Sequence, residues 1–274
     1  MSRISIFETI GDAYRFCWAG RRDFLMLAFL PVLVLALLGA LEYALVPAVP
    51  PVVETDDGEL MPVSFRPVRV LLFAVALVLY VMFAVAWHRR FLAPGETPAV
   101  GAALRWGGRQ TRFLARVVAL AVIGALVAAA GALLIVLPLV EIIGIAGFGL
   151  QFLTTVAVAL AAVTVYSRFL PLLPAAAVDA PLGFRACWRL TRGYSPHMVL
   201  IGILPVLPML LAALMASVLY GNLATAIGLL PSMTGVFLGT LIVQAINYAG
   251  VAVTVSALSI AYRDLTATGP VATT

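Results

Sequence analysis

Residues 68–92 read VRVLLFAVALVLYVMFAVAWHRRFL. The apolar run from Val68 to Ala86 is long enough to cross a bilayer as an α-helix, which takes about 20 residues. It ends at Trp87, His88 and two arginines, and both tryptophan and arginine favour the headgroup level of a membrane. The stretch therefore predicts a transmembrane helix whose carboxyl end lies at a membrane surface.

Further runs of this kind predict an all-α integral membrane bundle of six transmembrane helices. The six runs are 24–46, 68–86, 117–140, 145–166, 198–220 and 233–262. Pro31 in the first run, and Pro205 and Pro208 in the fifth, predict a kink or a local break in those helices. The 274 residues are 64% hydrophobic and 11% charged, which leaves no room for a water-soluble catalytic domain and excludes a cytosolic enzyme or a DNA-binding module.

The charges are sorted to one side of these spans. All 17 basic residues are arginines, and all except Arg66 and Arg69 fall on the same side as the two termini. Acidic residues dominate the opposite loops, above all the proline-rich segment 47–67. Because arginine-rich loops stay in the cytoplasm, we expect a multi-pass protein of a bacterial cytoplasmic membrane, with both termini cytoplasmic and 47–67 as an extracytoplasmic loop.

Two sets of arginines have the spacing i, i+4, i+7, which places three side chains on one narrow face of a helix. We expect both sets, together with a third helix at the N-terminus, to form amphipathic helices at the cytoplasmic interface. Their guanidinium groups would then bind lipid phosphates in a bidentate manner. The alternative is that they only fix topology and depth. The candidate lipid-phosphate residues are Arg105, Arg109 and Arg112 in the first stripe, and Arg185, Arg189 and Arg192 in the second stripe.

Interfacial helices and hairpins alternate along the chain. Each pair of spans closes on an aromatic residue with an arginine close behind it, as at Trp87, Tyr166 and Tyr262. This order predicts three parallel repeats of a helix-plus-hairpin unit about a pseudo-threefold axis. The alternative is convergence, because any six-helix protein of this topology gathers arginine and tryptophan at its cytoplasmic ends. The predicted units are approximately 4–92, 97–170 and 181–265.

The segment 167–193 carries a resemblance to a known group of proteins. Its motifs are Ser167-Arg168-Phe169-Leu170-Pro171, Pro174-Ala175 with Val178-Asp179, and Ala186-Cys187-Trp188-Arg189-Leu190-Thr191-Arg192-Gly193. They resemble the YciC-like bacterial six-helix membrane proteins and the membrane domain attached to some glycerophosphoryl diester phosphodiesterases. The resemblance implies an integral protein of the cytoplasmic membrane with a link to glycerophospholipid metabolism. It supplies no catalytic residue, because the phosphodiesterase domain is absent from this chain.

The sequence contains no group of residues typical of catalysis or of a metal or cofactor site. Its two histidines, His88 and His197, both fall at cytoplasmic ends of spans, and Cys17 and Cys187 fit no metal-ligand spacing. No charged residue or histidine lies near the centre of a span, whereas proton relays and ion pathways need such residues. We therefore predict a protein that is not an enzyme and needs no cofactor.

Uncharged polar residues do occur inside the spans. Gln244 and Asn247 in the sixth run and Gln151 in the fourth form a candidate polar spot. Such a spot either holds a headgroup or small solute or joins helices by hydrogen bonds. Gly235 and Gly239 form a G-x-x-x-G motif, which lets helices pack closely within one chain or between chains.

Together these features predict a scaffold, accessory subunit or lipid-handling protein in envelope homeostasis. Its expected partners are membrane lipids, in particular anionic phospholipid, with a partner membrane protein or a second copy of the chain as further options, and no nucleic acid. The alternatives are a transporter or channel for a lipid or small solute and, third, a membrane-embedded lipid-modifying enzyme. A hydrated cavity that reaches the midplane would favour transport, and a tightly packed centre would favour a scaffold.

Overall fold

The computed structural model describes residues 5–45, 52–54, 60–62, 67–95, 105–138, 141 and 148–268. Its helices are α1 (Ile6–Ala19), α2 (Arg21–Leu45), α3 (Pro67–Leu92), α5 (Gly108–Gly131), the π-helical turn η1 (Ala132–Val136), α7 (Phe148–Ser167), α8 (Leu172–Ala177), α9 (Phe184–Leu190), α10 (Ser195–Ile203), α11 (Val206–Ala226) and α12 (Met233–Thr268). Two short antiparallel strands, β1 (Val52–Glu54) and β2 (Leu60–Pro62), pair with Val53 opposite Met61. Most of the predicted loop 47–67 lies outside the described residues.

Six helical stretches in the described part of the chain are long and apolar enough to cross a membrane, so the predicted all-α fold with six spans is confirmed. The chain is a multi-pass helical membrane protein. In lipid a backbone must satisfy its own hydrogen bonds, which is why each long apolar run is a helix. The spans are Arg21–Leu45, Arg69–Leu92, Gly108–Val136, Phe152–Ala177, Ser195–Ala226 and Met233–Ala267.

The predicted break in the fifth span lies at Leu204 and Pro205, between α10 and α11. Proline has no N–H, so it cannot continue the hydrogen-bond ladder of a helix. The hydroxyl of Tyr14 in α1 donates a hydrogen bond to the carbonyl oxygen of Pro205 at 3.1 Å. Pro31, in contrast, lies inside α2, which continues through it.

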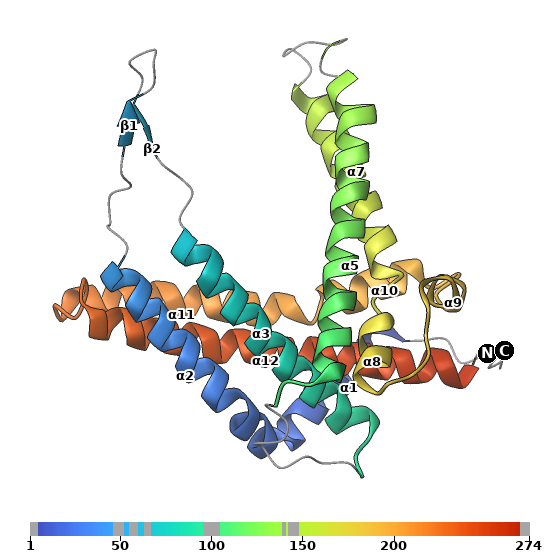
Figure 1. Cartoon of the computed structure of the whole chain (residues 1–274), viewed down its shortest axis with the longest axis horizontal. Helices are drawn as coiled ribbons and strands as arrows, with labels where there is room; N and C mark the ends of the chain where they lie inside the picture. The colour runs from blue at the N-terminus through green and yellow to red at the C-terminus, as the bar shows by residue number, and fades with distance from the viewer. Residues whose placement is uncertain are drawn as a thin grey trace.

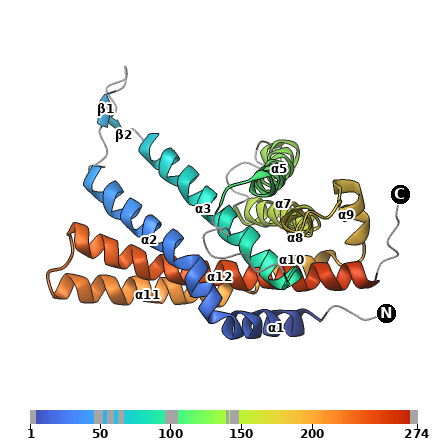
Figure 2. The same ribbon diagram turned by 60° about the horizontal axis from the view of Figure 1, so that its bottom comes forward.

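Three hairpins, α2–α3, α5–α7 and α11–α12, meet at one end of the molecule and diverge toward the other (Figures 1 and 2). Figure 1 shows α5 and α7 rising away from α11 and α12, with α2 and α3 between the two pairs. The short helices α1, α8 and α9 lie where the hairpins meet. Most arginines of the described residues lie there too, so we call it the arginine-rich end.

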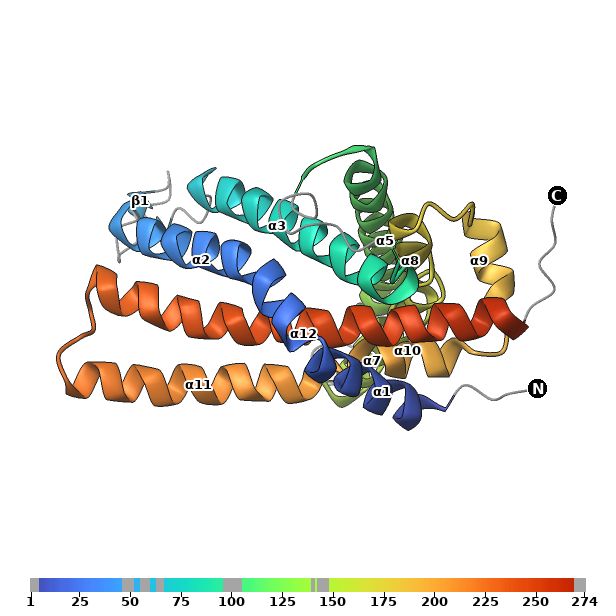
Figure 3. The same cartoon turned by 90° about the horizontal axis from the view of Figure 1, so that it is seen from below.

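Helix α12 is the centre of the packing. It contacts α1, α2, α3, α10 and α11, and Figure 3 shows it running the length of the molecule beside α11. Trp87 at the end of α3 is fully buried, and its Nε1 donates to Oγ of Ser256 in α12 at 2.9 Å. Phe16 of α1 packs edge-on against Trp87, with ring centroids 5.7 Å apart. Its residue type predicted a position among the lipid headgroups. Trp87 instead lies inside the protein, because α1 and α12 cover it.

The glycine pair of α12 packs within the chain. A Cβ on Gly239 would lie 2.7 Å from Cε1 of Tyr220 in α11, and a Cβ on Gly235 would lie 2.5 Å from the carbonyl oxygen of Leu229. The hydroxyl of Tyr220 donates to the carbonyl oxygen of Gly235 at 2.6 Å. Both glycines thus allow the α11–α12 hairpin to close.

Replacing Gly239 by alanine is expected to destabilise this hairpin, because the new methyl group overlaps a ring that its own hydrogen bond holds in place. Overpacking of this kind costs about 1–3 kcal/mol, which thermal unfolding in a nonionic detergent would measure. Gly221→Ala is the matched control, since nothing lies within 4 Å of a Cβ there, and it should leave stability unchanged or slightly raised. Equal stability of the two variants would contradict this packing.

Candidate functional site

The first stripe lies at the start of a spanning helix and not on a separate interfacial helix. The described residues just before Gly108 are not helical, and α5 begins there and continues into the span because nothing interrupts it. Nε of Arg109 donates to Oδ2 of Asp179 at 2.8 Å, and Arg112 pairs with the other carboxylate oxygen. Arg105 is exposed and has no ion-pair partner among the described residues.

Asp179 lies in the connection between α8 and α9 and has φ of 58°, a left-handed conformation that aspartate tolerates better than most residues. The hydrogen bond from Arg109, supported by the one from Arg112, lowers the pKa of its carboxyl. The two ion pairs join this connection to the start of α5. Both guanidinium groups therefore face a carboxylate of the same chain.

The second stripe is exposed. Arg185 and Arg189 lie on α9 and Arg192 follows it, and none of them has an ion-pair partner in the described part of the chain. Arg168 fixes α9: its guanidinium carbon lies 3.5 Å from the centroid of the Trp188 ring, and Nη2 donates to the Trp188 carbonyl oxygen at 2.7 Å. The second stripe thus presents three cations on an anchored helix.

Both cysteines are free thiols at the arginine-rich end. Cys187 of α9 is fully buried, and burial raises its pKa to about 12. Burial also raises the pKa of Cys17, whose sulfur lies 3.5 Å from Oγ of Ser256. Thiols with raised pKa values are poor nucleophiles at neutral pH, so both side chains serve the packing.

The candidate polar spot is only partly assembled. Gln244 Oε1 accepts a hydrogen bond from the hydroxyl of Tyr80 at 3.0 Å, so it joins α12 to α3. Asn247, one turn further along α12, lines the cavity described next. Gln151 lies in the first turn of α7, which packs on α5 and α10, and its side chain lies outside the described part.

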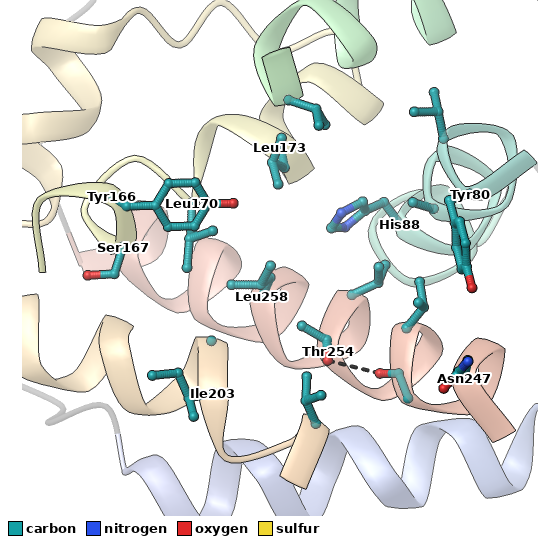
Figure 4. A pocket seen from close by; sticks show the side chains of 18 of the residues that line it. Tyr80, His88, Tyr166, Ser167, Leu170, Leu173, Ile203, Asn247, Thr254 and Leu258 are labelled. Atoms are coloured by element: carbon teal, nitrogen blue, oxygen red, sulfur yellow. Dashed lines mark hydrogen bonds between the residues drawn. The ribbon is translucent and has the colours of Figure 1, made fainter. Parts of the chain in front are cut away.

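A cavity of about 710 Å³ lies where α3, α5, α7, α10, α11 and α12 meet (Figure 4). Ligand pockets in proteins commonly measure about 300–1,000 Å³. Its walls are mostly aliphatic, and no charged side chain among the described residues lines it. The polar side chains in its walls are Tyr80, His88, Tyr166, Ser167, Asn247 and Thr254.

The exposed residues among its lining place the opening of the cavity to the side, between α7 and α11. Ile203 and Leu210 line it and are themselves 41% and 59% exposed, and Val163 on the facing helix α7 is also exposed. All three residues belong to membrane spans. The opening therefore lies at the level of the membrane spans.

His88 projects into the cavity from the end of α3 (Figure 4). The residue is 1% exposed, and its Nδ1 lies 2.7 Å from Oγ of Ser259 in α12. The Ser259 hydroxyl also lies 2.8 Å from the carbonyl oxygen of Val255, to which it donates its one proton. This network assigns the ring proton to Nδ1 and leaves Nε2 as a hydrogen-bond acceptor.

Comparison with protein families, with curated proteins and with solved structures finds no match to this chain. The YciC-like resemblance therefore rests on its own motifs. Within the described ranges, no three histidine, cysteine, aspartate or glutamate side chains gather as a metal site.

Sequence reasoning assigned no binding role to His88, and it used Tyr166 only as the aromatic residue that closes the second pair of spans. The available signal was the spacing of Leu77, Val81, Ala84 and His88, which places the histidine on the same face of α3 as three apolar cavity residues. Residue type instead pointed to the membrane surface. The partner helix that covers His88 comes from more than 150 residues away in sequence, as the 171-residue separation from Ser259 shows.

Asp179→Asn removes both ion pairs and leaves Arg109 and Arg112 without their carboxylate. Because the pairs are partly exposed, we expect the free energy of unfolding at neutral pH to fall by less than about 1 kcal/mol. The lowered pKa of Asp179 means that this contribution exists above the ordinary carboxyl value of 3.8 and is lost as pH falls through the folded-state value. The melting temperatures of the wild type and of Asp179→Asn should converge at acid pH. A difference that persists there would contradict a stabilising role of these two ion pairs.

Proposed function

We propose that this protein binds membrane lipid without catalysing a reaction, as a lipid-handling component or accessory subunit of a bacterial cytoplasmic membrane. The laterally open, apolar cavity carries this proposal. Because its opening lies among Val163, Ile203 and Leu210 within the spans, the molecules that reach it are those dissolved in the bilayer. An acyl chain fits its aliphatic walls and its volume.

The depth of the cavity supports an occupant from one leaflet. His88 and Ser167 lie next to the arginines at the ends of α3 and α7, whereas Leu77 and Asn247 lie further into the spans. The cavity thus extends from the arginine-rich end into the hydrocarbon. With arginine-rich loops in the cytoplasm, the occupant would come from the inner leaflet.

Transport of a small polar solute has less support. The oxygen of Gln244 already accepts a hydrogen bond from Tyr80, and the hydroxyls of Ser167 and Thr254 donate to backbone carbonyls of their own helices. The Gln244 oxygen and these two hydroxyl protons are therefore already used, and the walls of the cavity are mostly aliphatic. We therefore favour lipid binding over transport of a polar solute.

Leu210→Trp tests the cavity, because the indole would occupy its opening. Leu211→Trp is the matched control: Leu211 is 58% exposed on the same helix but does not line the cavity. In native mass spectrometry of protein released from lipid nanodiscs, we expect Leu210→Trp to lose retained lipid several-fold and Leu211→Trp to keep it. Lipid retention at the wild-type level in Leu210→Trp would overturn the proposal.

The exposed second stripe adds an interaction with anionic headgroups to this proposal. Cations at a membrane surface gain about 1 kcal/mol each from anionic lipid, and Arg185, Arg189 and Arg192 have no competing carboxylate in the described part of the chain. Arg105 shares this property, whereas Arg109 and Arg112 do not, since both bind Asp179. We therefore assign phosphate binding mainly to the second stripe.

Changing Arg185, Arg189 and Arg192 together to glutamine should lower the enrichment of phosphatidylglycerol over phosphatidylethanolamine among co-purified lipids. The same three positions changed to lysine retain the charge and should retain most of the enrichment. Quantitative lipid mass spectrometry measures both. Unaltered enrichment in the glutamine variant would leave these arginines with a role in topology alone.

A further inference from the structure

Two polar groups face each other inside the mostly aliphatic cavity. Figure 4 shows the hydroxyl of Tyr166, from α7, and the imidazole of His88, from α3, pointing toward one another across it. Neither Nε2 of His88 nor the Tyr166 hydroxyl has a hydrogen-bond partner in the described part of the chain. Polar groups in an apolar site normally find a partner, because an unmet hydrogen bond is costly.

The hydrogen-bonding capacity of this pair is defined. The Nδ1–H of His88 donates to Oγ of Ser259, so Nε2 can only accept. The Tyr166 hydroxyl has a proton to donate. A hydroxyl group placed between them can satisfy both, because its proton goes to Nε2 and its oxygen accepts from Tyr166.

The charge of the cavity walls limits what can carry that hydroxyl. No arginine among the described residues lines the cavity, and Arg168, two residues after Tyr166, is turned onto the Trp188 ring. A phosphate or carboxylate placed between His88 and Tyr166 would therefore be buried without a counter-ion, at a high cost. The group that fits is uncharged.

We infer that the cavity takes a lipid whose polar terminus is an uncharged hydroxyl group held between His88 and Tyr166. Its apolar chain would run past Leu77 and leave between α7 and α11 beside Leu210. Diacylglycerol and long-chain alcohols share this chemistry. The inference rests on the proposed lipid-binding function and specifies its ligand class.

The test uses the full-length protein in nanodiscs and four probes. Dioleoylglycerol and oleyl alcohol carry the hydroxyl, the methyl ether of dioleoylglycerol lacks its proton, and dioleoyl phosphatidic acid replaces it by a charge. We expect the methyl ether to bind about five- to tenfold more weakly than dioleoylglycerol, because it leaves Nε2 of His88 without a hydrogen-bond donor. Phosphatidic acid should bind more weakly still. Comparison of dioleoylglycerol with oleyl alcohol then decides which source of the hydroxyl the site prefers.

Two variants locate the effect. Tyr166→Phe keeps the ring, and His88→Asn keeps an amide donor toward Ser259 while it removes the Nε2 acceptor. Both should lose the preference for dioleoylglycerol over its ether. Tyr262→Phe is the control, because Tyr262 lies at the same end of the molecule but does not line the cavity, and it should keep the preference.

The outcomes separate this inference from the proposed function. If the wild type binds the ether or phosphatidic acid as well as dioleoylglycerol, the hydroxyl site is wrong while lipid binding stands. If no probe binds and Leu210→Trp retains as much lipid as the wild type, the lipid-binding function fails too. Since the ether comparison uses unaltered protein, the result does not depend on whether His88→Asn folds.

Discussion

Two side-chain hydrogen bonds between α3 and α12 determine how the rest of the molecule is arranged. Trp87 and His88, adjacent in sequence, each bond to a serine hydroxyl of α12, Ser256 and Ser259. Serines three residues apart share one face of a helix, so two consecutive residues of α3 can reach both. These bonds form at the arginine-rich end, where Phe16 of α1 covers Trp87. The hairpins are therefore fastened together at one end and separate toward the other.

A gap between diverging helices is tolerated here because the solvent is lipid. In water, exposed leucines such as Leu210 and Leu214 would favour collapse of α5–α7 onto α11, but hydrocarbon covers them equally well. Close packing is confined to sites of small residues, as at Gly239 against Tyr220. The cavity thus follows from fixed helix ends combined with a weak drive for the remaining faces to associate.

The spans and the break at Pro205 could be predicted from sequence because both follow from local rules of length and hydrogen bonding. The first stripe could not be placed, since the spacing i, i+4, i+7 is the same on an interfacial helix as on the first turns of a span. His88 and Trp87 were assigned to the surface by residue type, and only the distant serines of α12 reveal their burial. Asp179, which neutralises Arg109 and Arg112, is likewise remote from them in sequence.

Helix α12 is 36 residues long. At 1.5 Å per residue it measures about 54 Å, whereas the hydrocarbon core of a bilayer is about 30 Å thick. A helix so much longer than the core must tilt, extend beyond it or thicken the lipid around it. Because α12 is also the helix on which α1, α2, α3 and α11 pack, its inclination sets theirs. Hydrophobic mismatch would thus act on all the hairpins together, and a change in membrane thickness would change the tilt of the helices that pack on α12.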